Sequence, residues 1–285
     1  MNIGLIGAGL MGKPMAIKIK QARFNIAIYN RTKEKAKDLQ NEGIYSFNSV
    51  KELIEATDVI LLVVSDYNAI TNVLFTEDLS FENKTIIQMS TISPNESILL
   101  QNRINKLKGH YFEAPVLGST PQIDERKLIV LIGGQEEDEK KYSKLFSSFS
   151  NKIVFIGEVG KASAIKLALN QLIASETAAF SMSLGYLRER NVDVEKFMDI
   201  LRGSALYAPT FDKKLPNYMQ RDFSNPNFPL KHLLKDVRLM ISQFNEGGIN
   251  TLLLEGVEKV IRKGLDQKLS EKDYSSIYEV IHPPK

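Results

Sequence analysis

The sequence predicts an α/β fold, in which a doubly wound parallel sheet is followed by a long connecting helix and an all-α C-terminal domain. Short apolar runs alternate with helical segments from residue 2 to about residue 160, and beyond Gly160 only helical periodicity continues. Alternation of this kind is typical of a parallel sheet with helices on both faces. We therefore expect one domain at residues 1–160 and a second, all-α domain at residues 161–285.

The strands and helices of the first domain can be placed in order along the chain. The strand-like runs are short and apolar, and they lie at 2–6, 25–29, 58–64, 85–90, 127–134 and 152–157. Segments with helical periodicity separate them, one from about residue 10 and others at 33–43, 67–75, 95–107 and 136–149. Each strand is thus expected to be followed by a helix that crosses back over the sheet.

The second domain is predicted to open with one long helix at residues 161–191, about eight turns of sequence rich in Ala, Leu and Ser. This segment is apolar over much of its circumference, as expected of a helix that is packed on several sides. Further helical segments follow at 193–203, 228–248, 249–264 and 270–281.

Composition excludes several classes of function. The chain has 285 residues, a net charge of +3 and no cysteine, which excludes disulfides, thiolate nucleophiles and Cys-based metal sites. The histidines His110, His232 and His282 lack metal-ligand spacing, so no metal site is expected. No basic stripe indicates nucleic-acid binding, and no secretory leader or membrane-spanning run is visible, so we expect a soluble, cytoplasmic protein.

A glycine motif of the form G-x-G-x-x-G, Gly7, Gly9 and Gly12, follows the first strand and opens the first helix. In that position the glycines allow a tight turn, a close approach of backbone to a pyrophosphate, and close packing of helix on strand. The motif predicts a Rossmann-type dinucleotide site that includes Leu10 and Met11, whereas the alternative is a plain turn between strand and helix.

The end of the second strand predicts which dinucleotide binds. An acidic residue is expected there when a ribose 2′-hydroxyl is bound, but the chain carries Asn30, Arg31 and Thr32. Guanidinium and hydroxyl groups can donate to a 2′-phosphate, so the sequence favours NADP(H) over NAD(H). The alternative is that Arg31 only solvates the next helix or stacks on adenine. Val64 and Ser65, at the end of the third strand, are assigned to the same cofactor site.

One lysine of the long helix raises a question that the helix alone does not answer. Lys166 is followed one turn later by Asn170 in "GEVGKASAIKLALNQ" at 157–171. Lysine is a good helix former and asparagine is common on surfaces, so the stretch taken alone favours two solvent-exposed side chains with no catalytic role. Lys161 is expected to be such a surface residue.

Four stretches together resemble the β-hydroxyacid dehydrogenase family, which includes 3-hydroxyisobutyrate dehydrogenases, tartronate semialdehyde reductases and glyoxylate/succinic semialdehyde reductases. They are "GLIGAGLMGKPMA" at 4–16, "MSTISP" at 89–94, "EAPVLGSTPQIDERKLIVLIGG" at 113–134 and "GEVGKASAIKLALN" at 157–170. A fifth, "FPLKHLLKDVRL" at 228–239, is most similar to the glyoxylate/succinic semialdehyde branch. The order and spacing match over nearly the whole chain.

The resemblance implies a substrate site in the first domain. The family's substrate motif falls on Ser90 and Thr91, of which Thr91 is also assigned to the cofactor; the alternative is that this pair caps the helix beginning near residue 95. Backbone donors of a second motif fall on Gly118 and Ser119. Leu117 stands where the family usually has serine, a departure that leaves the reaction type in place and puts the identity of the substrate in question.

In the second domain the resemblance implies the catalytic groups. The family's catalytic lysine falls on Lys166 and its partner asparagine on Asn170. A second active-site lysine, which approaches the cofactor, falls on Lys235, an acidic support on Asp236, and a pocket-lining aromatic on Phe228. For the last three, the alternative is an ordinary amphipathic helix and its N-terminal anchor.

The expected activity is NADPH-dependent reduction of a small aldehyde acid, of the glyoxylate or succinic semialdehyde type, with Lys166 as proton donor. The alternatives are a 3-hydroxyisobutyrate- or 3-hydroxypropionate-type dehydrogenase, an imine reductase, against which Lys166 argues, or a non-catalytic cofactor-binding module. By resemblance alone, a homodimer or homotetramer is expected, with a small-molecule substrate and neither nucleic acid nor membrane as partner.

Overall fold

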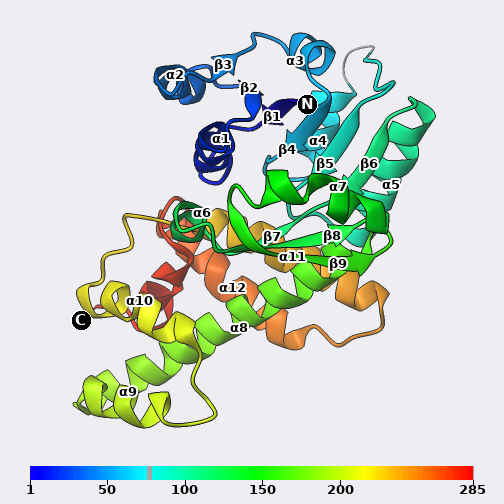
Figure 1. The fold of residues 1–285 in the computed structure, drawn as a ribbon. Coiled ribbons are helices and arrows are strands. Elements are labelled where there is room, and N and C mark those ends of the chain that lie inside the picture. Colours follow the sequence, from blue (N-terminus) through cyan, green and yellow to red (C-terminus); the bar gives the residue numbers. More distant parts are fainter. Residues whose placement is uncertain (76–78, 285) are drawn as a thin grey trace. The chain divides into compact units, whose positions relative to one another are not determined.

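The computed structural model describes residues 1–75 and 79–284 (Figure 1). The chain divides into two compact units, Met1–Lys166 and Leu167–Lys285, which we describe one at a time. The first contains a sheet with helices, and the second is built from helices. The long helix α8, Lys161–Glu189, begins in the first unit and continues through the start of the second.

The first unit is built on a mixed sheet in which, over the described residues, nine strands follow the order β3-β2-β1-β4-β5-β6-β8-β7, with β9 paired to β8. The first six positions reproduce the strand order of a dinucleotide-binding fold, and the strands from β1 to β6 are all parallel. The strands are β1 Asn2–Ile6, β2 Asn25–Tyr29, β3 Tyr45–Ser46, β4 Val59–Leu62, β5 Thr85–Gln88, β6 His110–Glu113, β7 Val116–Leu117, β8 Leu128–Gly133 and β9 Ser150–Gly157.

The far end of the sheet departs from the expected all-parallel arrangement. Strand β8 runs antiparallel to both β6 and β7, and β9 then runs parallel to β8. Between β6 and β8 the chain has only the two-residue strand β7 and the short helix α6, Thr120–Asp124. The link at 114–127 is long enough for a parallel crossover, but its helix α6 has only five residues and its strand β7 pairs with β8, so the chain returns antiparallel.

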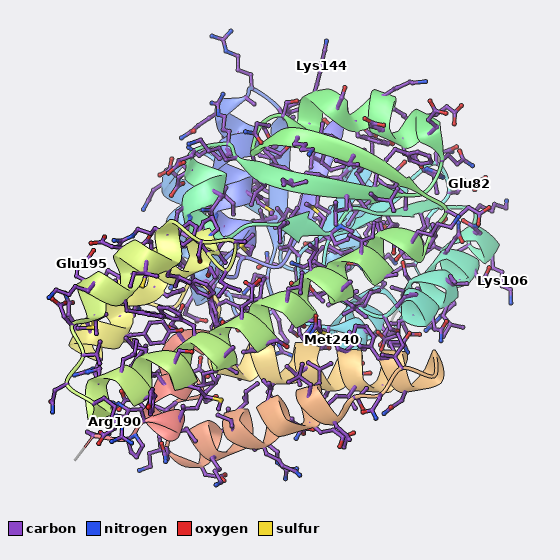
Figure 2. All side chains as sticks on the ribbon, turned by 90° about the horizontal axis from the view of Figure 1, so that it is seen from below. Glu82, Lys106, Lys144, Arg190, Glu195 and Met240 are labelled. Atoms are coloured by element: carbon purple, nitrogen blue, oxygen red, sulfur yellow. The ribbon has the colours of Figure 1, made fainter. Side chains whose placement is uncertain are left out.

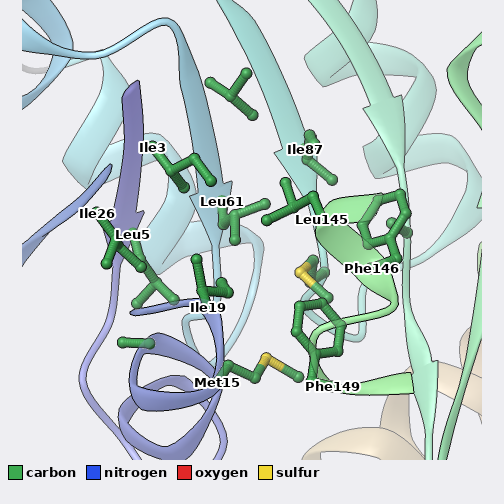
Figure 3. Packing of buried hydrophobic residues seen from close by; sticks show 14 of the residues in the cluster. Ile3, Leu5, Met15, Ile19, Ile26, Leu61, Ile87, Leu145, Phe146 and Phe149 are labelled. Atoms are coloured by element: carbon green, nitrogen blue, oxygen red, sulfur yellow. The ribbon is translucent and has the colours of Figure 1, made fainter. Parts of the chain in front are cut away.

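Apolar side chains fill both faces of the sheet, which explains why the strands read as continuous apolar runs. On one face, Leu61 and its neighbours pack against Met15 and Ile19 of α1 and Phe146 of α7 (Figure 3). On the other face, Ile60 packs in a cluster with side chains of three helices, α3 (Val50–Ala56), α4 (Tyr67–Leu74) and α5 (Pro94–Lys106). Successive strand residues point to opposite faces, so Ile60 and Leu61 serve different cores.

The helices of this unit include the predicted ones and two that the periodicity did not reveal, α3 and α6. Their bounds are α1 Gly12–Gln21, α2 Glu34–Asn41, α3 Val50–Ala56, α4 Tyr67–Leu74, α5 Pro94–Lys106, α6 Thr120–Asp124 and α7 Glu136–Phe146. Helix α5 begins with a capping box in which Ser93 accepts from the N–H of Glu96 and the Glu96 carboxylate accepts from the N–H of Ser93. Ser93 therefore caps this helix, and Ser90 and Thr91 do not.

Helices of the second unit pack around two apolar cores. One joins α8 to α11 and α12, and includes Met240, which is labelled in Figure 2. The other joins Phe180 and Leu184 of α8 to α9, α10 and Tyr278. After α8 the helices are α9 Val194–Arg202, α10 Pro209–Gln220, α11 Leu230–Glu246, α12 Leu252–Asp266, the 3₁₀ helix η1 Tyr274–Ile277 and α13 Tyr278–Ile281.

One face of α8 is apolar and exposed. Leu172 is 51% exposed, Met182 63% and Tyr186 62%, and their spacing places them on one side of the helix. The expectation that α8 is packed on several sides is therefore not met within a single chain. Figure 2 shows α8 as one unbroken rod.

Candidate active site

In the glycine loop after β1, two positions have no room for a side chain because of the protein's own backbone. Gly7 has a φ of +109°, and a Cβ there would collide with the backbone carbonyl of Val63. A Cβ on Gly12, the first residue of α1, would collide with the carbonyl oxygen of Gly7. A Cβ on Gly9 would meet nothing within 4 Å. Open space above Gly9 is what the cradle for a pyrophosphate needs, so the loop fits a dinucleotide.

The side chain of Asn30 holds this loop from the end of β2. Its Oδ1 accepts from the N–H of Ala8 at 2.9 Å, and its Nδ2 donates to the carbonyl oxygen of Thr32 at 2.7 Å. Asn30 thus links the glycine loop to the turn after β2. Arg31 and Thr32 follow with exposed side chains. Leu10 is exposed, and Met11 is half-buried immediately before α1.

Residues after β4 and β5 are tied together by one serine. Ser90 is buried, and its Oγ accepts from the N–H of Val64 at 3.0 Å and lies 3.4 Å from the carbonyl oxygen of Leu62. Its hydroxyl therefore joins the ends of two parallel strands. Ser65 is exposed and Thr91 is half-buried on the same edge of the sheet.

The first-unit residues assigned to the cofactor or substrate from Gly7 to Thr91 all follow the carboxyl ends of β1, β2, β4 or β5. These four strands are neighbours in the order β2-β1-β4-β5. In open α/β sheets, ligands bind beyond this end of the strands. The fold therefore brings these predicted residues to one edge.

The second substrate motif forms the start of α6. Gly118 has a φ of +123°, and a Cβ there would lie 2.5 Å from Leu128. The N–H and the hydroxyl of Ser119 both donate to Oε1 of Gln122, at 3.0 and 2.9 Å. These groups of Ser119 therefore serve as a helix cap. Leu117 lies in β7 and pairs with Ile129 of β8.

In the second unit, Asp236 joins two of the predicted site residues. Its Oδ2 accepts from Nδ2 of Asn170 at 2.7 Å, and Nζ of Lys235 lies 2.7 Å from its Oδ1 as an ion pair without hydrogen-bond alignment. Both Asn170 and Asp236 are buried. Oδ1 of Asn170 is buried and has no hydrogen-bond partner. Lys166 lies one turn before Asn170 on α8 and is half-buried.

Phe228 is held just before α11 by a network that the sequence did not suggest. Its carbonyl oxygen accepts from the N–H of Tyr274 at 2.9 Å, and its ring stacks near His232 with the ring centroids 6.4 Å apart. Burial, with the charges of two nearby lysines, lowers the pKa of His232 below its ordinary value. The fully buried Asp273 carboxylate binds Nζ of Lys214 at 2.7 Å and the N–H of Asn227 at 3.1 Å, which fixes the segment before Phe228.

The most connected polar side chain of the first unit, Glu113, was not singled out by the sequence analysis as a site residue. It is fully buried at the end of β6 and accepts hydrogen bonds from the first turn of α8. Its place in "EAPV" was visible, but its partners lie about fifty positions away in sequence, so no local pattern indicated them. Lys161, which lies between Gly160 and Ala162 at the start of α8, is exposed as predicted.

The described part of the chain has neither a metal-binding cluster nor a membrane-spanning helix. Within residues 1–75 and 79–284, no group of three or more His, Cys, Asp or Glu side chains could hold a metal ion. Among the same residues, no helix combines the length and apolar character needed to cross a membrane.

Comparison with known proteins places the chain in a family. Residues 2–157 match the family model described as the NAD-binding domain of 6-phosphogluconate dehydrogenase. Residues 160–281 match the model described as NAD-binding of NADP-dependent 3-hydroxyisobutyrate dehydrogenase. The chain belongs to the β-hydroxyacid dehydrogenase family. It is therefore an NAD(P)-dependent oxidoreductase that acts on a hydroxyl group.

Relatives align with this β-hydroxyacid dehydrogenase over nearly its whole length. Glyoxylate/succinic semialdehyde reductase 1 of Arabidopsis thaliana is 27% identical over 99% of this chain and 98% of its own. The 2-hydroxy-3-oxopropionate reductase of Escherichia coli K12 is 26% identical over 99% and 97%. The structure of 3-hydroxyisobutyrate dehydrogenase from Salmonella typhimurium is 17% identical, with a TM-score of 0.88 over 98% and 99% of the two chains. This last likeness shows a shared fold.

Proposed function

We propose that this β-hydroxyacid dehydrogenase reduces a small aldehyde acid with NADPH, using Lys166 as the proton donor. The observation that carries the proposal is the amide of Asn170. Its nitrogen is fixed by Asp236, while its buried Oδ1 has no hydrogen-bond partner. A buried acceptor without a partner costs about 1–3 kcal/mol, and in native proteins such a group calls for an explanation. A ligand or an ammonium group that it receives during the reaction supplies one.

The roles of the two helix residues follow from their chemistry. Residues at i and i+4 share a helix face, so Asn170 can receive a hydrogen bond from the Lys166 ammonium or from the hydroxyl of the product. When bound, the reduced nicotinamide supplies the hydride that reaches the carbonyl carbon. The Lys166 ammonium stabilises the negative charge that develops on the carbonyl oxygen and gives that oxygen its proton.

The preference for NADPH is supported by the turn after β2. This turn presents the exposed side chains of Arg31 and Thr32 and carries no carboxylate before Glu34, the first residue of α2. A guanidinium group binds phosphate through charge-assisted hydrogen bonds, and a carboxylate would repel it. Asn30 contributes by holding the glycine loop through Ala8. We propose that Gly9, Leu10, Met11, Val64, Ser65 and Lys235 complete the cofactor contacts.

The class of substrate is supported by what the relatives' names share. Glyoxylate, succinic semialdehyde and 2-hydroxy-3-oxopropionate are all small carboxylates that carry an aldehyde. We propose that Thr91 and the backbone of Gly118 hold the carboxylate in this chain. The hydroxyls of Ser90 and Ser119 also belong to the assigned substrate motifs, but they are bound to Val64 and Gln122 within the protein. Phe228 and Asp236 are proposed to line the substrate side of the second unit.

A homo-oligomer is supported by the exposed apolar face of α8. Leu172, Met182 and Tyr186 are each more than half exposed along one side of this helix. Burying apolar area is worth roughly 25 cal/mol per Å², so a second copy of the chain would be stabilised by covering this face. We propose that α8 lies in the interface of a homodimer or homotetramer.

The experiment that tests the function is a panel of small aldehyde acids assayed with NADPH and with NADH, for wild type and for Lys166→Ala. Loss of a proton donor typically costs a factor of about 10² to 10⁴ in rate, so we expect kcat to fall by that amount. The matched control is Lys161→Ala, on the same helix, where the lysine is exposed and lies 4.0 Å from Glu158. Its kcat is expected to stay within about two-fold of wild type, since surface ion pairs contribute little. A Lys166→Ala enzyme with near wild-type kcat would refute the mechanism.

A further inference from the structure

The buried carboxylates Asp236 and Asp273 each have a lysine ammonium 2.7 Å away, whereas the donors to Glu113 are N–H and hydroxyl groups. Glu113 is fully buried, and Oε1 accepts from the N–H groups of Gly160, Ala162 and Ser163, at 2.9, 2.8 and 3.1 Å. Oε2 accepts from the hydroxyls of Ser163 and Ser97, both at 2.6 Å. These five bonds require an acceptor at every contact, which an ionised carboxylate provides.

The three N–H groups are those that a helix cannot satisfy by itself. Helix α8 begins at Lys161, so Gly160 is its N-cap residue and Ala162 and Ser163 belong to the first turn. The first N–H groups of a helix have no intrahelical partner, and a side chain usually caps them. Gly160 has no side chain, so a carboxylate from β6 takes its place. The negative charge of Glu113 also lies at the positive end of the helix dipole.

The surrounding residues are shaped to admit this carboxylate. A Cβ on Gly133, the register partner of Glu113 in β8, would collide with the Glu113 carboxylate. Gly160 has a φ of +100°, which lets the chain turn its N–H toward β6. On the far side, Ser97 lies 2.8 Å from the hydroxyl of Tyr111. Burial raises the pKa of Tyr111, so its phenol stays protonated and donates to Ser97, which in turn donates to Glu113.

We propose that Glu113 is the positioning residue for Lys166. It fixes where α8 begins and how the helix is rotated about its axis, and Lys166 follows Ser163 by three residues, less than one turn. The direction of the Lys166 side chain is set by that rotation. This inference rests on the proposed function of Lys166, and it adds a residue that touches neither substrate nor cofactor.

The test compares Glu113→Gln with Asp138→Asn in the full-length protein. Asp138 is a matched control because it is a buried carboxylate that accepts from the N–H of Gln135, at 2.9 Å, before a different helix, α7. Three quantities are measured: amide hydrogen exchange of residues 160–163, kcat with the preferred aldehyde acid, and the Kd for NADPH. Glutamine keeps one oxygen acceptor while its nitrogen only donates, so Glu113→Gln removes the negative charge from the start of α8 and places an NH2 group opposite either the three N–H groups or the two serine hydroxyls.

We expect Glu113→Gln to speed exchange at residues 160–163 at least ten-fold and to lower kcat at least ten-fold. Its Kd for NADPH should stay within about two-fold, because the glycine loop between β1 and α1 is untouched. A general loss of fold would instead raise the Kd. Asp138→Asn also loses the contact of Asp138 with His110 of β6, at 2.6 Å, so it should speed exchange in α7 and at His110, leave exchange at residues 160–163 unchanged, and keep kcat within about two-fold. A Glu113→Gln enzyme with faster exchange and wild-type kcat would overturn the positioning role.

If Glu113→Gln does not fold, Ser97→Ala with Ser163→Ala removes both hydroxyl partners of Oε2 and leaves the carboxylate and the three N–H bonds in place. This double variant should lower kcat several-fold and speed exchange at residues 160–163. Unchanged values of both would overturn the proposal. A wild-type enzyme that reduces no aldehyde acid in the panel would refute the proposed function, whereas an active Glu113→Gln enzyme would refute only the positioning role.

Discussion

The contact between Asn170 and Asp236 gives a prediction that can be worked out from the structure. Nδ2 of Asn170 donates to the buried carboxylate of Asp236 at 2.7 Å. Asp236→Asn keeps the shape of the side chain and removes its charge. One side of the new amide must then present N–H groups to Asn170 or to the ammonium of Lys235, both of which are donors.

The size of the effect follows from what is lost. A hydrogen bond to a charged group contributes about 1.5–3 kcal/mol, against about 1 kcal/mol for a neutral one. The ion pair adds less, because the Lys235 side chain is 26% exposed and solvent screens it. We expect Asp236→Asn to lower the free energy of unfolding by about 2 kcal/mol. We also expect kcat to fall about ten-fold, which corresponds to about 1.4 kcal/mol in the transition state, because the amide of Asn170 loses the contact that fixes it.

The assay is a double-mutant cycle of Asp236→Asn with Asn170→Ala, read by denaturant unfolding. Residues in contact show interaction energies of about 0.5–3 kcal/mol, and the difference between a charged and a neutral hydrogen bond sets our expectation near 1 kcal/mol. Glu258→Gln is the control, because its ion pair with Arg238 at 2.9 Å joins α11 to α12 with the arginine side chain 54% exposed. Its cost should stay below about 1 kcal/mol, with kcat unchanged. Additivity of Asp236→Asn and Asn170→Ala within about 0.3 kcal/mol would refute the reasoning.

Three further predictions follow from other parts of the chain. Gly9→Ala should keep the free energy of unfolding within about 0.5 kcal/mol and weaken NADPH binding at least ten-fold in a fluorescence titration, whereas Gly12→Ala, which meets the carbonyl of Gly7, should destabilise the fold itself. Arg31→Ala should raise the KM for NADPH about ten-fold and leave the KM for NADH within about two-fold, because only the former carries a 2′-phosphate. Met182→Glu with Tyr186→Glu should shift the mass in light scattering to that of a monomer, and an unchanged mass would remove α8 from the interface.

Much of the fold could be predicted because the central strands β1, β4 and β5 are buried on both faces. Runs such as Val59–Leu62 are apolar without interruption, and that pattern marked the order of strands and helices. What escaped prediction is short. Strands β3 and β7 have two residues each and β6 has four, and helices α6 and α3 have five and seven, lengths at which little periodicity can show. The antiparallel direction of β8 follows from the pairing of β7 with β8 and from the shortness of α6, and the sequence pattern reveals neither.

The candidate site divides in the same way. The glycine loop could be predicted from spacing, because a tight turn and close packing of helix on strand require glycine at Gly7 and Gly12. In the structure, a Cβ at these positions would collide with the backbone carbonyls of Val63 and Gly7, respectively. The pairing of Asn170 with Asp236 joins positions 66 residues apart, and resemblance alone suggested that both matter. The sequence did not indicate that the hydroxyls of Ser90 and Ser119 form hydrogen bonds within the protein. A serine after a strand can bind a ligand or a neighbouring protein group, and the sequence pattern is the same in both cases.

The scaffold of the catalytic helix and the departure at Leu117 are separate features of the structure. Two of the stretches that carried the family resemblance meet at the Glu113 carboxylate: residues 113–134, which supply Glu113 and Gly133, and residues 157–170, which supply Gly160. Leu117 pairs instead with Ile129, farther along the β7–β8 pairing, and none of the five bonds to Glu113 involves it. We therefore expect a change at position 117 to leave the five bonds of Glu113, and with them the start of α8, in place, so that under the proposed function it would act on the choice of substrate and not on the position of Lys166.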